Sequence, residues 1–272
     1  MSAVGIRPAH NKAAIRKEKA ELGLCERGLT NMLDISLGDT FNNTREMQLI
    51  GNSWKFILPN RPKLAGTSDL CAFIPKIIVM LGLQLPTDRR WAELIRQDMA
   101  ELLTDHAWCE QKAASNAISM IVRYPELSDL VTALTRIAQE ELEHFGQVVE
   151  KIHARGWKLG PERKDNYVNE LFQFLRKDGN REERLVDRLL FSAMIEARSC
   201  ERFKLLTEEV ADPELRTFYH DLMVSEAGHY TTFIGYARQF GDKVDVDARW
   251  KQFLAYEAEV VQRYGTAPTM HG

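Results

Sequence analysis

Cysteine is scarce in this chain, and its spacing excludes several classes of protein. The 272 residues contain 4 cysteines, and no two of them form a Cys-x-x-Cys pair. A zinc ribbon or a disulfide-stapled scaffold needs more cysteines at closer spacing. Unpaired cysteines are typical of a reducing compartment, so we expect a cytoplasmic protein.

Long apolar runs are also missing. The most apolar stretch, residues 71–85, contains Pro75 and Lys76 and is shorter than the ~20 residues that a membrane-spanning helix needs. The beginning of the chain lacks the apolar segment of a secretory signal peptide. The sequence therefore predicts neither a membrane span nor secretion.

Charge of one sign is not in large excess either. The formal net charge is -3 at pH 7, whereas a protein held to nucleic acid mainly through phosphates carries a strongly basic surface. Any binding of nucleic acid by this chain must therefore depend on a local surface.

A repeated Glu-x-x-His spacing is the most informative feature that is present. It occurs at Glu141–His144 and at Glu226–His229, preceded by Glu110 at 31 residues and by Glu196 at 30 residues. Residues i and i+3 of a helix share a face, so each pair can reach one metal ion. Four glutamates and two histidines in an internal repeat form the ligand set of di-iron or di-manganese four-helix bundles. We expect the first glutamate of each Glu-x-x-His pair to bridge two ions.

A third Glu-x-x-His, at Glu150–His153, has a different meaning. It begins nine residues beyond the first pair, and nine steps of about 100° place it on the opposite face of the helix. We interpret it as a surface feature. Two further polar residues are candidates to orient the imidazoles: Glu140 lies four residues before His144, and Ser225 lies four before His229.

Helical periodicity begins near residue 88. We expect long helices over residues 89–123, 128–155, 181–210 and 213–241, and shorter ones over 166–177 and 247–264. The connection between the second and third long helices is long and partly helical, whereas the other two are short. This predicts an all-α fold: a ferritin-like four-helix bundle with one long crossover plus extra short helices.

The remaining parts of the chain are less regular. Residues 80–265 would form the di-iron domain. Residues 1–79 are poorly patterned, and we expect either an N-terminal extension or coding sequence upstream of a start at Met80 that is absent from the mature protein. Residues 266–272 are expected to be a flexible tail.

Four segments carry a family resemblance. They are DHAWCEQKAAS (105–115), EELEHF (140–145), IEARSCERF (195–203) and SEAGH (225–229). They closely resemble the MiaE family, the tRNA 2-methylthio-N6-isopentenyladenosine hydroxylases, over about residues 80–265. The first and third segments are the specific ones, because generic di-iron proteins do not share them.

The resemblance implies an O2-dependent non-haem di-iron monooxygenase. Its substrate would be the isopentenyl side chain of the modified adenosine beside the anticodon, in the anticodon loop of tRNA. It also implies an external electron donor, either a redox partner protein or a reductase, since the chain has no flavin or nicotinamide fingerprint. The iron ligands implied are Glu110, Glu141, His144, Glu196, Glu226 and His229.

Contacts to tRNA are harder to place. Arg198 and Arg202 in the third segment, and Arg181 and Arg184 upstream of it, are candidates. Structural ion pairing and a solvated surface of mixed charge remain open as other interpretations of these arginines.

Two other functions remain open. One is an iron-oxidising or storage protein, or a peroxidase of the rubrerythrin type, although rubrerythrins usually add a Cys-x-x-Cys module. The other is a metal-free helical interaction module in which the Glu-x-x-His pairs are accidental. The sequence does not predict the oligomeric state.

Overall fold

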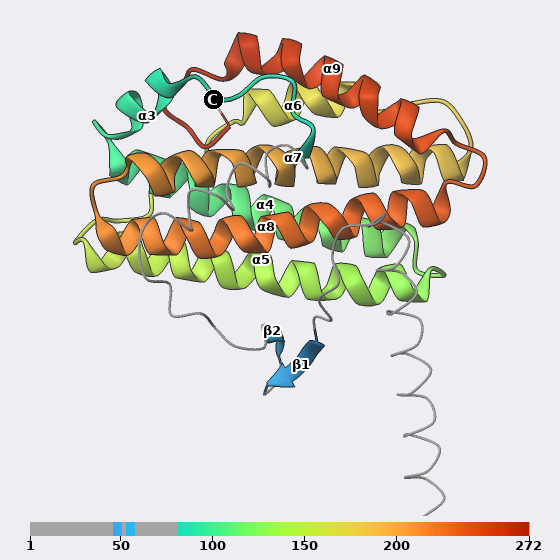
Figure 1. Ribbon diagram of the computed structural model, residues 1–272, viewed down its shortest axis with the longest axis horizontal. Helices are drawn as coiled ribbons and strands as arrows, with labels where there is room; N and C mark the ends of the chain where they lie inside the picture. Colours follow the sequence, from blue (N-terminus) through green and yellow to red (C-terminus); the bar gives the residue numbers. More distant parts are fainter. Residues whose placement is uncertain (1–45, 51–52, 58–80, 272) are drawn as a thin grey trace, which may run out of the picture. The chain divides into compact units, whose positions relative to one another are not determined.

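The chain divides into two compact units, Met1–Ala65 and Gly66–Gly272. The computed structural model describes residues 46–50, 53–57 and 81–271, the first two stretches by their backbone alone. In the first unit, β1 (Glu46–Ile50) and β2 (Ser53–Ile57) form an antiparallel pair (Figure 1). The rest of the predicted extension over 1–79 lies outside the described residues.

Four long helices form the bundle of the second unit. They are α4 (Met99–Arg123), α5 (Ser128–Ala154), α7 (Arg181–Glu209) and α8 (Pro213–Phe240). Helix α4 packs along α5 and α7 along α8, while the crossover from α5 to α7 contains α6 (Asn166–Gln173) (Figure 1). Helix α9 (Val246–Tyr264) lies against α6 and α7. This confirms the ferritin-like bundle with one long crossover and extra short helices. No helix in the described part of the chain is long and apolar enough to cross a membrane.

Capping residues set the ends of the long helices. Asn180 and Glu183 form a capping box at the start of α7, and Asp212 caps α8 with Pro213 at its first position. Helix α5 stops just before Gly156, whose φ of 73° suits glycine. The predicted bounds of α5, α7 and α8 are therefore confirmed to within one or two residues.

Two helices are shorter than the sequence predicts. The helix expected over 89–123 is divided into α3 (Arg89–Ile95) and α4, because Asp98 leaves the helical conformation and its side chain caps the first turn of α4. Helix α6 stops about one turn early. There the backbone N–H of Arg176 donates to the buried carboxylate of Asp187 at 2.8 Å, which draws the chain out of the helix.

A layer of buried charged side chains divides the hydrophobic core in two. One apolar cluster includes Leu134 of α5 and Leu189 of α7, and the other includes Val148 of α5 and Leu206 of α7. Between them lie the glutamates and histidines of the repeated motif, none more than 8% exposed. Burying so many ionisable groups is unfavourable unless a partner compensates their charge.

The residues after α9 pack against the bundle, which corrects the expectation of a flexible tail over 266–272. Met270 is fully buried and His271 is 3% exposed. The buried guanidinium of Arg202 donates to three backbone carbonyls of this segment at 3.0–3.2 Å. The indole of Trp91 also donates to one of these three carbonyls, that of Thr269, at 3.0 Å. A buried arginine with backbone partners thus fixes the segment in place.

Candidate metal centre

The four glutamates and two histidines of the repeated motif meet in the middle of the bundle. Their ligand atoms form two groups, and within each group all atoms lie within 4.8 Å of one another. The first group is Glu110 of α4, Glu141 and His144 of α5, and Glu226 of α8. The second is Glu196 of α7, Glu226 and His229 of α8, and Glu141. Glu141 and Glu226 belong to both groups, which is the placement expected of bridging residues.

The Nδ1 atoms of both histidines face the carboxylates. Nδ1 of His144 lies 3.4 Å from Oε2 of Glu110 and 3.6 Å from Oε1 of Glu226. Nδ1 of His229 lies 2.8 Å from Oε1 of Glu141 and 3.6 Å from Oε2 of Glu226. The two ring centroids are 6.0 Å apart. Each imidazole therefore belongs to its own half of the centre.

The chemistry of these residues fits two metal ions. Within the six residues of the centre, four buried atoms have no hydrogen-bond partner: Oε1 of Glu141 and of Glu226, and Nδ1 of His144 and of His229. The short distance between His229 and Glu141 is an ion-pair contact that lacks hydrogen-bond alignment. Unpaired buried polar atoms are unfavourable by about 1–3 kcal/mol each, and cations would satisfy all four. Carboxylates and imidazoles without a thiolate suit iron or manganese.

The close packing of these groups changes their proton affinity. Burial and the neighbouring carboxyl groups raise the pKa of Glu110 and of Glu196 well above the usual range. Burial acts in the same direction on Glu141, but its contacts with the two histidines outweigh burial and lower its pKa. Burial would lower the pKa of His144, yet its carboxylate partners raise it to about 10. Metal ions must therefore displace protons to bind here.

Glu140 holds an imidazole, but not the one that the sequence predicts. Its Oε2 lies 2.8 Å from Nε2 of His229 on α8, across the bundle, and not beside His144 on its own helix. Within residues 81–271, Ser225 makes no hydrogen bond to His229, so its predicted role is corrected too. Glu140 orients the ring so that Nδ1 points into the centre.

His106 is a neighbour of the centre that the repeated motif does not identify. Its Nε2 lies 2.6 Å from Oε1 of Glu110, one turn later on α4. The ring is fully buried against Phe203 and Tyr219. Burial lowers the pKa of His106 to about 3, so the neutral ring can donate one hydrogen bond to the carboxylate. The only signal in the sequence is the four-residue spacing from Glu110.

The four arginines proposed for tRNA lie in two different environments, and two of them are interior. Arg198 and Arg202 are fully buried. Arg198 forms ion pairs with Glu257 at 2.7 Å and Glu201 at 3.0 Å, and Arg202 is bound to the backbone after α9. Neither guanidinium reaches the surface. The prediction that they contact tRNA is therefore wrong, because helix α9 and the segment after it cover this side of α7.

Arg181 and Arg184 are exposed at the start of α7. Arg181 lies over the ring of Tyr124, 4.9 Å from its centroid, and pairs with Glu126 at 2.6 Å. Arg184 lines a pocket of about 330 Å³ that combines basic and aromatic side chains. The other residues lining it are Arg123, Tyr124, Phe172, Gln173, Leu175, Arg176, Lys177 and Arg188.

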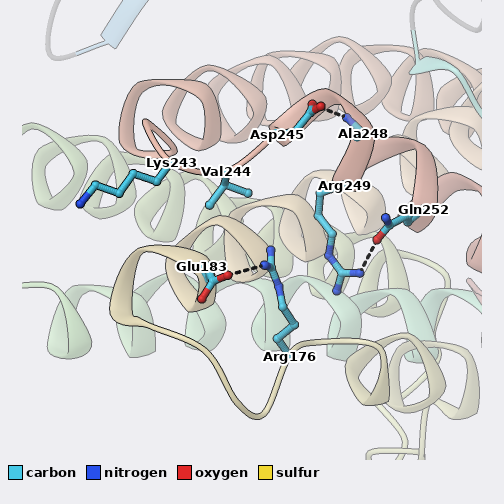
Figure 2. Close-up of a pocket in the computed structure, with 8 residues that line it drawn as sticks. All are labelled: Arg176, Glu183, Lys243, Val244, Asp245, Ala248, Arg249 and Gln252. Carbon is cyan, nitrogen blue, oxygen red and sulfur yellow. Dashed lines mark hydrogen bonds and ion pairs between the residues drawn. The ribbon is translucent and has the colours of Figure 1, made fainter.

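A second surface pocket, of about 280 Å³, lies where the start of α9 meets α7 (Figure 2). Its walls carry both charges, and its arginines already have partners. Arg176 pairs with Glu183 at 3.2 Å, and Arg249 pairs with Asp187 at 2.7 Å. None of the six residues of the metal centre lines this pocket, so we do not place the chemistry there.

Sequence comparisons agree with the resemblance. Residues 74–272 match the family model described as tRNA-(MS[2]IO[6]A)-hydroxylase (MiaE). A Pseudomonas putida protein named tRNA 2-(methylsulfanyl)-N(6)-isopentenyladenosine(37) hydroxylase is 40% identical over 191 residues, covering 70% of this chain and 91% of the relative. A Salmonella typhimurium protein of the same name is 29% identical over 238 residues, covering 69% and 87%.

The fold has a solved counterpart. The structure of "Protein 43 with aldehyde deformylating oxygenase activity from Synechococcus" matches with a TM-score of 0.65 and 36% identity, over 70% of this chain and 95% of that chain. The family model spans most of the sequence and includes all six residues of the metal centre. The chain therefore belongs to the MiaE family of tRNA hydroxylases.

Proposed function

We propose that this protein is an O2-dependent non-haem di-iron monooxygenase. Its substrate would be 2-methylthio-N6-isopentenyladenosine next to the anticodon in tRNA, hydroxylated on the isopentenyl side chain. The observation that carries the proposal is the buried centre of four glutamates and two histidines in a chain of this family. The names of the Pseudomonas putida and Salmonella typhimurium relatives support the choice of nucleoside.

Two iron ions would occupy equivalent places in the centre. One ion would be held by Glu110 and His144, the other by Glu196 and His229, with Glu141 and Glu226 bridging. When bound and reduced by an external donor, such a pair of ions supplies the activation of O2. Glu140 accepts a hydrogen bond from Nε2–H of His229, and the lone pair on Nδ1 then faces the centre. The apolar clusters on both sides exclude water from the site.

Charge balance supports divalent ions. Four carboxylates carry four negative charges, which two divalent cations cancel while both imidazoles are neutral. A buried site without net charge avoids the large desolvation penalty of an uncompensated ion. Without cations, Glu110 and Glu196 would hold protons, as their raised pKa values indicate.

The pocket beside Arg184 is the proposed tRNA contact. Arg184 and Arg188 precede Glu196 on α7 by twelve and eight residues, or about 18 and 12 Å along the helix at 1.5 Å per residue. Bases splayed out of a loop stack on aromatic rings such as that of Phe172. We include Arg181, which is exposed on the same helix end.

Nucleoside mass spectrometry of tRNA tests the activity. In cells that make the isopentenyl nucleoside but lack the hydroxylase, expression of this protein should add one oxygen atom to that nucleoside. Glu141→Ala should leave the tRNA unchanged and lose iron. The matched control is His153→Ala, an exposed histidine on the same helix, which should retain both. Unchanged tRNA in the presence of the iron-loaded protein, O2 and a reductant would contradict the proposed substrate.

Aldehyde deformylation is a second candidate activity, favoured by the likeness to the Synechococcus structure. The same six residues would hold the ions, so the centre itself does not distinguish the two. The iron-loaded protein should be supplied with reductant and O2, and with either tRNA or an aliphatic aldehyde. Release of formate from the aldehyde, with unchanged tRNA, would favour this second activity.

A further inference from the structure

A second group of metal-binding side chains lies beside α4, outside the carboxylate centre. Sγ of Cys109, a carboxylate oxygen of Asp165 and a ring nitrogen of His271 lie within 4.8 Å of one another. They come from three separate parts of the chain: α4, the residue that caps α6, and the segment after α9. The proposed hydroxylation uses none of them.

Nδ1 of His271 contacts both other members of the group. It lies 2.8 Å from Oδ2 of Asp165 and 3.8 Å from Sγ of Cys109. Zn²⁺ binds sulfur at about 2.3 Å and nitrogen or oxygen at about 2.0–2.2 Å, which sets tetrahedral ligand atoms about 3.4–3.6 Å apart. To hold the ion, the distance between Nδ1 and Oδ2 would widen by about 0.6 Å and the distance between Nδ1 and Sγ would shorten by about 0.2 Å.

The outer atoms of two of these side chains are already held. Nε2 of His271 lies 3.2 Å from Oγ of Ser199, which can accept a hydrogen bond from Nε2–H. In that tautomer the lone pair of the ring is on Nδ1. Oδ1 of Asp165 accepts from the N–H of Val168 as the cap of α6, so Oδ2 faces the group. The ring of Tyr167 stacks on the imidazole with centroids 5.4 Å apart. Metal-binding histidines and carboxylates are oriented by contacts of this kind.

The types of side chain identify the class of metal. Thiolate, imidazole and carboxylate together suit Zn²⁺, and one thiolate with one carboxylate cancels its charge. We propose that Cys109, Asp165 and His271 bind a zinc ion that joins α4, the crossover and the segment after α9. Asp105 is not counted among the ligands, because its Oδ2, 3.9 Å from Sγ of Cys109, already accepts the backbone N–H of Met270 at 2.6 Å. The carboxylate centre has no thiolate, so the two sites differ in metal preference.

Cobalt substitution tests this site separately. A thiolate bound to Co²⁺ gives a charge-transfer absorption that carboxylates and imidazoles do not give. We expect this band in the full-length protein, and one Zn²⁺ per chain when the metal is zinc. Cys109→Ser should lose the band and the zinc, and His271→Ala should lose the zinc. Cys200→Ser is the matched control, because its Sγ contacts the carbonyl of Met223 outside the group, and it should retain both.

Absence of the band from the unaltered protein, or an unchanged band in Cys109→Ser, would overturn the proposal. If Cys109→Ser does not fold, the unaltered protein remains decisive through alkylation and peptide mapping. Zn²⁺ should protect Cys109 from the alkylating reagent, and removal of the ion by a chelator should expose it; equal alkylation in both states would also overturn the proposal. These readouts do not depend on tRNA hydroxylation, so either proposal can fail without the other.

Discussion

Replacing Arg198 with methionine tests whether this arginine belongs to the interior or to a tRNA surface. Its guanidinium is fully buried and contacts the buried carboxylates of Glu257 and Glu201 at 2.7 and 3.0 Å. The hydroxyl of Tyr167 also donates to Glu257, at 2.9 Å. Arg198→Met keeps most of the aliphatic volume and removes the charge, so both carboxylates lose their cation.

The expected loss of stability follows from the two buried carboxylates that remain without a cation. Removing one partner of a buried ion pair destabilises a protein by about 3–5 kcal/mol, which is a large part of a typical stability of about 5–15 kcal/mol. For a unit of this size each kcal/mol lowers the Tm by about 2–4 °C, so we expect a fall of about 6–20 °C. Within the described part of the chain, the exposed Arg184 has no buried carboxylate partner, and Arg184→Met should change stability by no more than about 0.5 kcal/mol.

Urea unfolding followed by circular dichroism, at matched metal content, measures these differences. The variants are Arg198→Met, Arg184→Met, Glu257→Gln, and the pair Arg198→Met with Glu257→Gln. The paired variant should lower the free energy of unfolding by less than the sum of the two single changes, because both single changes remove the same interaction. An Arg198→Met protein as stable as Arg184→Met would refute the interior assignment. Loss of tRNA affinity in that stable protein would place Arg198 at the nucleic-acid surface instead.

Three further outcomes are expected at the metal centre. Glu226→Ala should lose both ions, because Glu226 belongs to both groups, whereas His153→Ala should keep them; elemental analysis after anaerobic loading measures this. Glu140→Gln should weaken iron binding by about 10–100-fold in competition with a chelator, and Ser225→Ala should leave it unchanged. Iron occupancy should rise with pH, because the carboxyl and imidazole groups with raised pKa values must release protons first. Occupancy that fell as the pH rose from mildly acidic to neutral would contradict that sign.

The sequence predicts the bundle and the grouping of the six side chains because both depend on local rules. The i, i+3 spacing places Glu141 and His144 on one face wherever the helix lies. Capping residues such as Asn180 and Asp212 act within one turn of the helix that they begin. The repeat then requires only that similar helices pack with their polar layers at the same level.

Features that depend on neighbours distant in sequence could not be predicted in this way. Periodicity distinguishes an inward face from an outward one, but α7 is covered on most sides by α8, α9 and the segment after α9. Arg198 and Arg202 are therefore buried. A pattern of one apolar and one polar helix face would instead assign them to solvent. Glu140 contacts His229 on another helix. Its four-residue spacing from His144 gives no indication of this contact. The buried Met270 is fixed by Arg202, some seventy positions earlier in the chain.

The division of the metal centre between two helix hairpins bears on how the centre is assembled. Helices α4 and α5 supply three residues of the first group and α8 supplies the fourth; α7 and α8 supply three of the second and α5 the fourth. Each hairpin thus carries most of one site before the hairpins dock, and docking completes both sites at once. An ion bound early by one hairpin would recruit the other through Glu226 or Glu141, so metal capture and closure of the core would be one cooperative event.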